Sequence, residues 1–415
     1  MTPRQPTHPL TRPRPSGRMR RSRPARFLFC TNECVGLGHM RRTLTLAGAV
    51  TERDPDASAL VLTGAPIAPG LQLPARVDTV KLPMLARDPV RGLGARNLVM
   101  ESGDLHDLRA SLAHAAATAF APDVAVIDKL PLGLGGELEP TLEALRAAGT
   151  RIVLGLRDVE EDPMQVRRRW REMNAEDALR RYYDTVLVYG PAGGDADALS
   201  CVGWNDARVR VEHVGYIGAP LPDDPPRDLP RDYVLATVGG GADGFPVLFA
   251  VVEAVRERPL PLPVVVVTGP LMDPAEVRRL RERAAGHAVH VFEARPDMDA
   301  VVAAARGVVA MAGYNTVAEV TRAGHPAVLV PRVGPSNEQL IRARALAGTG
   351  SFAMIHPDEL TPGRMAAELA SMLGRPRPTF EPAEHRGAAV AAEILAELAA
   401  RPAVSPPAPV LAQAV

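Results

Sequence analysis

Short runs of apolar, largely β-branched residues recur along the chain, and a stretch rich in Ala, Leu and Arg follows most of them. The runs are apolar throughout, which is typical of strands buried on both faces of a parallel sheet. The stretches between them have the periodicity of amphipathic helices, so the alternation predicts βαβ units and doubly wound sheets. The expected strands are Phe27–Thr31, Ala59–Thr63, Val124–Asp128, Arg151–Leu156, Thr185–Tyr189, Tyr233–Val238, Val264–Thr268, Val289–Phe292, Gly307–Met311 and Ala327–Val330, and the expected helices include Asp104–Ala119, Glu139–Ala148, Pro274–Ala285 and Asn337–Ala347.

This strand–helix series occurs twice. A proline- and acid-rich linker, residues 217–230, separates the two runs. A chain of 415 residues has room for about two domains. We therefore expect an α/β protein with two Rossmann-like domains and mainly parallel sheets, residues 26–216 and 231–378, facing each other across a cleft. A carboxyl-terminal helix within residues 379–400 could pack on either domain.

The composition excludes several classes of protein. Residues 1–25 are rich in Arg and Pro and residues 401–415 in Pro and Ala, so both are expected to be disordered tails, with a functional basic arm as the alternative for the first. No run approaches the ~20 uninterrupted apolar residues of a membrane span. The formal net charge is zero, which gives no general attraction to nucleic acid. The three cysteines form no disulfide or zinc pattern, which favours a cytoplasmic protein.

Three junctions between a strand and the following helix contain residues suited to chemistry. The first is Gly36-Leu-Gly-His-Met-Arg-Arg42. Its glycines allow a tight turn and the close approach of a ligand. His39 would lie at a helix N-terminus, where the dipole favours a neutral imidazole that can accept a proton. An exposed histidine beside a glycine turn, without a function, explains the spacing equally well.

The second junction is Gly239-Gly-Gly241, after the strand Tyr233–Val238. Its backbone amides could cradle a diphosphate. The run matches neither the dinucleotide-binding nor the Walker A pattern, and an ordinary glycine-rich turn is an equal alternative.

The third junction, Gly313 to Gln339, is the longest. Thr316-x-x-Glu319 and Ser336-x-x-Gln339 both fit the helix capping box, which alone would account for these four polar side chains. Capping does not explain why two such helices follow successive strands at one edge of a sheet.

Together these segments resemble the donor half of GT-B glycosyltransferases. Gly-x-Asn-Thr-x-x-Glu from Gly313, Gly-x-Pro-x-x-x-x-Pro from Gly324, and a Glu-Gln pair before a helix are similar to the enzymes that add N-acetylglucosamine to the lipid-linked peptidoglycan precursor, with their glycosyltransferase family 28 carboxyl-terminal domain. The Gly-x-Gly-His-x-x-Arg loop from Gly36 is similar to the matching loop of that family. The stretch Val124–Glu137 looks more like a bacterial branch of glycosyltransferases whose acceptors are undefined.

The resemblance implies a role for each matching residue. Glu319 would bind the ribose hydroxyls of the nucleotide, and Glu338 and Gln339 would hold sugar hydroxyls. The start of the Asn315 helix and the glycine run would enclose the diphosphate. His39 would face the scissile bond from the opposite domain as the catalytic base. The donor-binding candidates are Gly38, Gly239, Gly240, Gly241, Gly313, Asn315, Thr316, Glu319, Glu338 and Gln339.

The expected reaction is an inverting transfer of a sugar from a UDP-sugar, with UDP-N-acetylhexosamine as the favoured donor, and without a metal or other cofactor. Amide-rich loops and helix N-termini can neutralise the leaving diphosphate without a metal. Three Asp-x-Asp tripeptides begin at Asp54, Asp195 and Asp297. The third is the best metal candidate, yet acidic residues are also favoured there because a helix follows.

The acceptor stays open at this point, between a lipid-linked molecule and a small-molecule glycan or natural product. Asp128 ends one expected strand and Arg157 follows another, both on the cleft side, and either could orient the acceptor or simply form an ion pair. Met84–Met100 mixes apolar and basic residues and could touch a membrane, which would place the protein peripherally at its inner face. A solvated active-site lid is the commoner explanation for such a loop. A UDP-sugar hydrolase and a non-catalytic nucleotide-sugar-binding subunit are the alternative functions.

Overall fold

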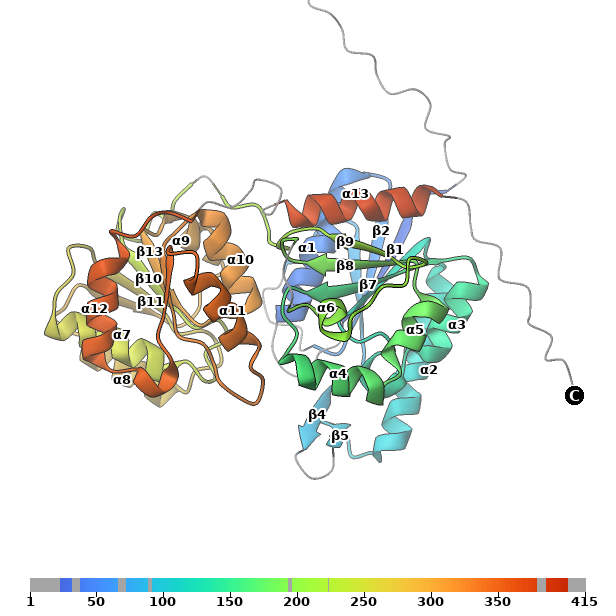
Figure 1. Cartoon of the computed structure of the whole chain (residues 1–415), viewed down its shortest axis with the longest axis horizontal. Coiled ribbons are helices and arrows are strands. Elements are labelled where there is room, and N and C mark those ends of the chain that lie inside the picture. The colour runs from blue at the N-terminus through green and yellow to red at the C-terminus, as the bar shows by residue number, and fades with distance from the viewer. Residues whose placement is uncertain are drawn as a thin grey trace, which may run out of the picture.

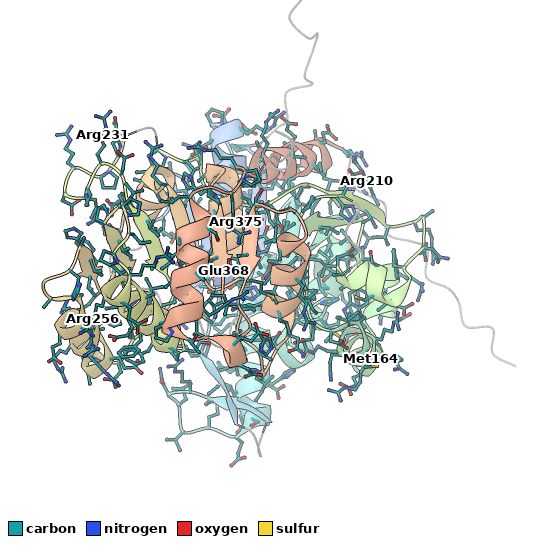
Figure 2. All side chains as sticks on the ribbon, turned by 60° about the vertical axis from the view of Figure 1, so that its left-hand side comes forward. Met164, Arg210, Arg231, Arg256, Glu368 and Arg375 are labelled. Atoms are coloured by element: carbon teal, nitrogen blue, oxygen red, sulfur yellow. The ribbon has the colours of Figure 1, made fainter. Side chains whose placement is uncertain are left out.

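The computed structural model describes residues 23–31, 38–65, 72–88, 92–192, 196–222, 224–378 and 386–401. Figure 1 shows two lobes, each a sheet covered by helices and joined by an extended segment. Most of both predicted tails lies outside the described residues, as does Gly36. The outer helices carry charged side chains, and Figure 2 labels one such pair, in which Arg375 Nη2 lies 2.7 Å from Glu368 Oε2.

The amino-terminal domain is built on a seven-stranded sheet in the order β3-β2-β1-β6-β7-β8-β9, with all neighbours parallel. Strands β6 and β8 are wholly buried, as their uninterrupted apolar sequence requires. The strands are β1 (Arg26–Cys30), β2 (Ser58–Thr63), β3 (Val77–Lys81), β6 (Val124–Asp128), β7 (Arg151–Arg157), β8 (Thr185–Tyr189) and β9 (Arg210–His213), and the helices are α1 (Gly38–Arg53), α2 (Ser102–Phe120), α3 (Glu139–Ala147), α4 (Pro163–Glu172), α5 (Ala175–Tyr182) and α6 (Ala198–Val202).

The carboxyl-terminal domain has a six-stranded parallel sheet in the order β12-β11-β10-β13-β14-β15. Its strands are β10 (Val234–Thr237), β11 (Val264–Val267), β12 (Val289–Phe292), β13 (Gly307–Ala310), β14 (Ala327–Leu329) and β15 (Phe352–Met354), and its helices are α7 (Phe245–Glu257), α8 (Pro274–Ala284), α9 (Met298–Ala304), α10 (Tyr314–Ala323), α11 (Glu338–Ala347) and α12 (Pro362–Met372). The predicted fold class is confirmed.

Each sheet reverses its strand order once. In the first sheet the reversal lies between β1 and β6, and in the second between β10 and β13. At such a reversal the loops that leave the carboxyl ends of the two strands turn in opposite directions and open a crevice, which is where α/β proteins bind ligands. The molecule therefore has two such crevices.

The final helix, α13 (Gly387–Ala400), returns from the second domain and packs on α1 of the first (Figure 1). Gly387 permits this return, because a Cβ there would lie 2.4 Å from the carbonyl oxygen of Tyr216. The side chains of Leu395 and Leu398 are buried in the core that this packing creates. The helix thus packs on the amino-terminal domain, a choice that the sequence leaves open.

Some strands were not expected from the sequence. Edge strand β3 reads Val-Asp-Thr-Val-Lys and is only partly buried, so it lacks a continuous apolar run. Strands β4 (Leu85–Asp88) and β5 (Gly92–Ala95) form a small antiparallel pair outside the main sheets. Such strands are defined by their partners more than by their own sequence.

Candidate active site

His39 and Asp128 meet at the crevice of the first sheet. His39 is the second residue of α1, after β1, and Asp128 is the last residue of β6, which pairs with β1. The Nδ1 atom of His39 contacts Oδ2 of Asp128 in a short hydrogen bond. This contact fixes the tautomer with the proton on Nδ1 and leaves Nε2 to accept a proton. Asp128, predicted as a possible acceptor ligand, is thus placed to orient the histidine.

Electrostatics favour a neutral imidazole beside an ionised carboxylate. Burial lowers the pKa of His39, Asp128 acts against this, and the Arg42 and Arg157 cations lower it further. Burial opposes ionisation of Asp128, but Arg42 and His39 outweigh burial and hold its pKa well below the usual value. A neutral histidine backed by a carboxylate is the arrangement of a general base.

The start of α10 forms the corresponding crevice of the second sheet. Gly313 precedes the helix with extended backbone, and no described side chain caps it. Thr316 lies inside the helix, so the predicted capping box of Thr316 and Glu319 is wrong. The amides of the first turn of α10 have no partner within the helix and point to where an anion would bind.

The second predicted capping box is also wrong. Helix α11 begins at Glu338 after Asn337, whose side chain does not cap it. Ser336 Oγ instead accepts a hydrogen bond from the backbone N of Glu338 at 3.4 Å. Gln339 is buried, and its Oε1 atom accepts a hydrogen bond from the backbone N of Arg332 at 3.0 Å. Gln339 therefore holds the loop after β14 and does not reach back to Ser336.

Glu319 and Glu338, the two glutamates predicted to bind the donor, both pair with arginines of the other domain. Arg41 Nη2 of α1 lies 3.0 Å from Glu319 Oε1 and 3.6 Å from Asp299 Oδ1. Burial raises the pKa of Glu319 to about 7, although Arg41 lowers it. The two carboxylates thus share one exposed cation, and Glu319 titrates near neutral pH.

Glu338 is part of a second cluster across the cleft. Arg157 Nη2 lies 2.6 Å from Glu338 Oε2 and 3.0 Å from Glu160 Oε2. Lys129 Nζ lies 3.4 Å from the same Glu160 oxygen, and burial lowers the pKa of Lys129. Arg157 therefore serves as a bridge between the domains, where the sequence left ion pairing and acceptor binding open.

The glycine run lies beside the same crevice, at the end of β10, which neighbours β13. Gly239 and Gly241 have positive φ values of 65° and 94°. A Cβ on Gly241 would lie 2.2 Å from the carbonyl oxygen of Thr268, and Gly240 O accepts a hydrogen bond from Leu271 N at 2.8 Å. The run is thus packed against the loop after β11, and Gly241 is required there by the close approach of two backbones, whereas nothing lies within 4 Å of a Cβ on Gly239.

The two crevices face each other directly. Asn315 Nδ2, on the first turn of α10, donates a hydrogen bond to the carbonyl oxygen of Gly38, the first residue of α1, at 3.1 Å. A Cβ on Gly38 would lie 3.4 Å from the same Nδ2 atom, an ordinary van der Waals contact, so the two helix starts are close together without requiring glycine at this position. A buried ion pair adds to the contact, with Arg342 Nη2 of α11 lying 2.8 Å from Asp158 Oδ1 after β7.

A pocket of about 990 Å³ adjoins this meeting point. Its walls come from α1, α10, α13 and the segment around Gly218, and they include Arg41, Asn315 and Glu319. This volume lies at the upper end of the range for small-molecule sites.

Among the described residues, no group of three or more His, Cys, Asp and Glu side chains could hold a metal ion. Both carboxylates of the best Asp-x-Asp candidate form ion pairs with arginines. Arg295 Nη2 lies 2.7 Å from Asp297 Oδ2, and Arg41 Nη2 lies 3.6 Å from Asp299 Oδ1. Asp197 caps α6.

Three residues of the site were not assigned a role from the sequence. Arg42 is the last residue of the histidine motif, Tyr314 lies at the unspecified position before Asn315, and Arg41 belongs to no motif. Arg42 Nη2 lies 2.7 Å from Asp128 Oδ1 and 3.0 Å from His39 Nδ1. The three-residue spacing of His39 and Arg42, one helical turn, was the available signal.

Comparison with known proteins shows what the second half is similar to. Residues 235–398 match the model of the glycosyltransferase family 28 C-terminal domain. A UDP-N-acetylglucosamine–N-acetylmuramyl-(pentapeptide) pyrophosphoryl-undecaprenol N-acetylglucosamine transferase of Methylobacterium nodulans is 36% identical over 173 residues, 40% of this chain and 46% of that protein. The enzyme of the same name from Methylobacterium radiotolerans is 30% identical over 184 residues, 41% of this chain and 50% of that protein. The chain spans about half the length of these relatives.

Solved structures share the whole architecture. MurG of Acinetobacter baumannii matches with a TM-score of 0.54 at 16% identity, over 89% of this chain and 95% of that chain. A UDP-glucosyltransferase from Polygonum tinctorium capable of glucosylating indoxyl matches with a TM-score of 0.55 at 15% identity, over 91% of this chain and 99% of that chain. The fold is therefore GT-B, with a carboxyl-terminal half similar to family 28, and the predicted resemblance is confirmed.

Proposed function

We propose that this chain is a glycosyltransferase that moves a hexosyl group from a nucleotide-sugar donor to an acceptor hydroxyl, with His39 as the base. The observation that carries the proposal is the hydrogen bond from Asn315 to Gly38. It brings the family 28-like crevice of one domain against the His39–Asp128 pair of the other. A donor in one crevice and a base in the other is the arrangement that glycosyl transfer requires.

The donor is proposed to be UDP-N-acetylhexosamine. Support comes from the names of the relatives, which give UDP-N-acetylglucosamine as the sugar source. In this chain Glu319 would accept hydrogen bonds from the ribose hydroxyls, and Glu338 would turn from Arg157 to the sugar. The start of α10 and the glycine run would enclose the diphosphate, with Gly313 allowing the ligand to approach the helix amides.

The reaction is proposed to proceed with inversion. His39 Nε2 takes the proton of the acceptor hydroxyl while the oxygen attacks the anomeric carbon from the face opposite the diphosphate. The bond from the anomeric carbon to the phosphate oxygen breaks, and its electron pair leaves with the diphosphate. Asp128 stabilises the imidazolium that forms. The amides at the start of α10 neutralise the leaving group, so the transfer is proposed to need no metal.

The acceptor is proposed to be lipid-linked, as the names of the relatives indicate for them. No helix among the described residues is long and apolar enough to cross a membrane. Leu98, Val99 and Met100 form an exposed apolar strip between β5 and α2. This strip would attach the protein peripherally to a membrane surface, and no nucleic acid is involved.

A panel of UDP-, GDP- and dTDP-sugars, with and without Mg²⁺, tests the donor by thermal shift. A ligand at 100 times its Kd adds about 2.7 kcal/mol to stability. We expect a response to UDP and UDP-N-acetylhexosamine that Mg²⁺ does not increase. A chain that responds to none of these nucleotides is not a glycosyltransferase of this type.

The competing function is a UDP-sugar hydrolase, since the His39–Asp128 pair would activate water equally well. The two are distinguished by supplying the donor alone and then with lipid-linked or soluble acceptor hydroxyls. Release of UDP that is slow without acceptor and accelerated by it supports transfer. Rapid, stoichiometric release of UDP and free sugar without acceptor would establish the hydrolase, and tight UDP binding without turnover a binding subunit.

A further inference from the structure

The guanidinium of Arg42 is the link between the catalytic pair and the other domain. It is buried, and its Nη2 atom contacts both Asp128 and His39. Asp128 thus compensates this cation through the Nη2 atom, while Nε is buried and has no hydrogen-bond partner among the described residues.

Two tyrosine rings lie beside this guanidinium. The Cζ atom of Arg42 lies 5.4 Å from the ring centre of Tyr189, at the end of β8, and 5.2 Å from that of Tyr314. Both distances are within cation–π range. Tyr189 belongs to the same domain as Arg42, whereas Tyr314 is the first residue of α10 in the donor-binding domain.

Tyr314 is itself fixed by three neighbours. Its hydroxyl oxygen accepts a hydrogen bond from the backbone N of Ile217 at 2.9 Å, which ties it to the segment between the domains. Its ring meets that of Tyr216 edge to face at 5.7 Å, and Arg342 Cζ lies 5.8 Å from its centre. Movement of the donor-binding domain against the first domain must therefore move the ring that covers Arg42.

We propose that Tyr314 is a positioning residue of the His39 base: through Arg42 it makes the geometry of the His39–Asp128 pair depend on how the donor-binding domain is seated. The proposal rests on the proposed function, because it assigns His39 as the base. Its consequence is that the base is correctly placed only when the crevice that holds the donor is closed against it.

The charged groups that act on His39 define the expected effect. They are Asp128 of β6, Arg42 of α1 and Arg157 of β7. Arg42 lowers the pKa of His39, and so does burial. Replacing the Tyr314 ring by a smaller side chain loosens Arg42 and admits water, and both changes raise the pKa of His39.

The test is an NMR titration of the histidines in the full chain without donor. The chain has 10 histidines, and a His39→Gln variant assigns the signal of interest. Tyr314→Leu should move the titration of His39 to higher pH, whereas Tyr314→Phe, which keeps the ring, should leave it unchanged. Tyr182→Leu is the matched control, because Tyr182 is equally buried but its hydroxyl contacts Glu139 and Glu143.

An unchanged His39 titration in a folded Tyr314→Leu protein overturns the proposal, as does a shift of the same size in Tyr182→Leu. Tyr314→Met takes the place of the leucine variant if that variant does not fold. These readouts need no activity, so they hold even if the chain proves not to be a transferase. If the chain transfers sugar, the pH at which kcat falls on the acid side should be higher in Tyr314→Leu than in the wild type. On that acid side, kcat of the variant should be about tenfold below that of the wild type.

Discussion

Asp128 is the single residue whose replacement best separates chemistry from binding. Asp128→Asn keeps the size of the side chain but removes the charge that fixes the tautomer of His39 and stabilises its cation. We expect kcat to fall by about 10²- to 10⁴-fold, like His39→Ala, since positioned base catalysis contributes this much. UDP affinity, measured by calorimetry, should stay unchanged, because both residues lie in the domain opposite the donor crevice.

His106→Ala, on an exposed histidine of α2, serves as the control and should leave kcat unchanged. If Asp128→Asn and His39→Ala both transferred sugar at the wild-type rate, another base would have to be sought.

Glu319 gives the site a pH dependence of its own. Its pKa of about 7 means that it changes from acid to carboxylate near neutral pH. A carboxylate accepts both ribose hydroxyls better than the protonated acid does. UDP affinity should therefore rise as pH increases through about 7, and Glu319→Gln should remove this dependence. Isothermal calorimetry from pH 6 to 8.5 measures it, with Glu359→Gln on an exposed glutamate as the control; a wild-type affinity independent of pH contradicts the assignment.

The same shift makes a prediction for stability with the opposite sign. The folded pKa of Glu319 is about 7 and the ordinary value is 4.5, so the folded state retains a proton that the unfolded state has lost. The free energy of unfolding contributed by this group falls as pH rises between these values, by up to about 3 kcal/mol. In denaturant titrations, the free energy of unfolding of Glu319→Gln should not show this decrease as pH rises.

At this scale the sequence singled out the residues of the proposed donor site, whose roles stay predictions, but it did not indicate their partners. The spacing of Thr316 and Glu319 is the same for a capping box and for a ligand-binding pair, so only the observed helix start separates them. Tyr314 could not be assigned, because its importance comes from Arg42, which is distant in sequence and belongs to the other domain.

Among the elements, the loop after β10 shows how backbone packing sets the donor crevice. Gly241→Ala should destabilise the protein strongly, because its Cβ would strike the carbonyl oxygen of Thr268 at 2.2 Å. Gly286→Ala is the matched control, since Gly286 also has a positive φ of 78° but has nothing within 4 Å of an added Cβ. We expect the control to cost about 1 kcal/mol, from the left-handed backbone alone. Gly241→Ala should lower the free energy of unfolding, measured by denaturant titration, at least twice as much as the control does. Equal losses in the two variants would mean that the loop shifts to accommodate the added Cβ without further cost.

The segment between β5 and α2 carries the prediction about membranes. Replacing Leu98, Val99 and Met100 together by serine should reduce co-sedimentation with anionic lipid vesicles about tenfold, because most of the exposed apolar area of the segment is lost. Met164→Ser, on an exposed methionine of α4 (Figure 2), is the control and should bind as the wild type does. If the triple variant bound vesicles as well as the wild type does, residues 98–100 would not form the proposed membrane contact.

Most of the central strands of both sheets follow from the sequence because they are continuous apolar runs. The edge strands β3, β9 and β15 and the β4–β5 pair do not: β3 is only partly buried, β15 has three residues, and β4 and β5 acquire strand geometry from each other. The order of the strands places His39 beside Asp128, and the sequence pattern alone contains no information on that pairing.

At the scale of the whole molecule, the arginines that cross the cleft compete with the donor. Arg41 pairs with Glu319 and Arg157 with Glu338, so the donor contacts proposed for these two glutamates would have to replace both ion pairs. The pair of Arg342 and Asp158 involves no donor residue and can persist in both states. The sequence could not indicate this competition, because it depends on the two domains meeting.

Arg41→Met tests the competition directly. Side-chain exposure of 44% for Arg41 places its pair with Glu319 among ion pairs worth about 0.2–1 kcal/mol. Above the pKa of Glu319, at pH 8.5, removing Arg41 should therefore increase UDP affinity by up to about fivefold, an effect that added salt mimics in the wild type. Arg168→Met, on an exposed arginine of α4, should change nothing. Weaker UDP binding by Arg41→Met would mean that this arginine contacts the nucleotide itself. Arg41 would then exchange its ion pair with Glu319 for a contact with the donor when the cleft closes.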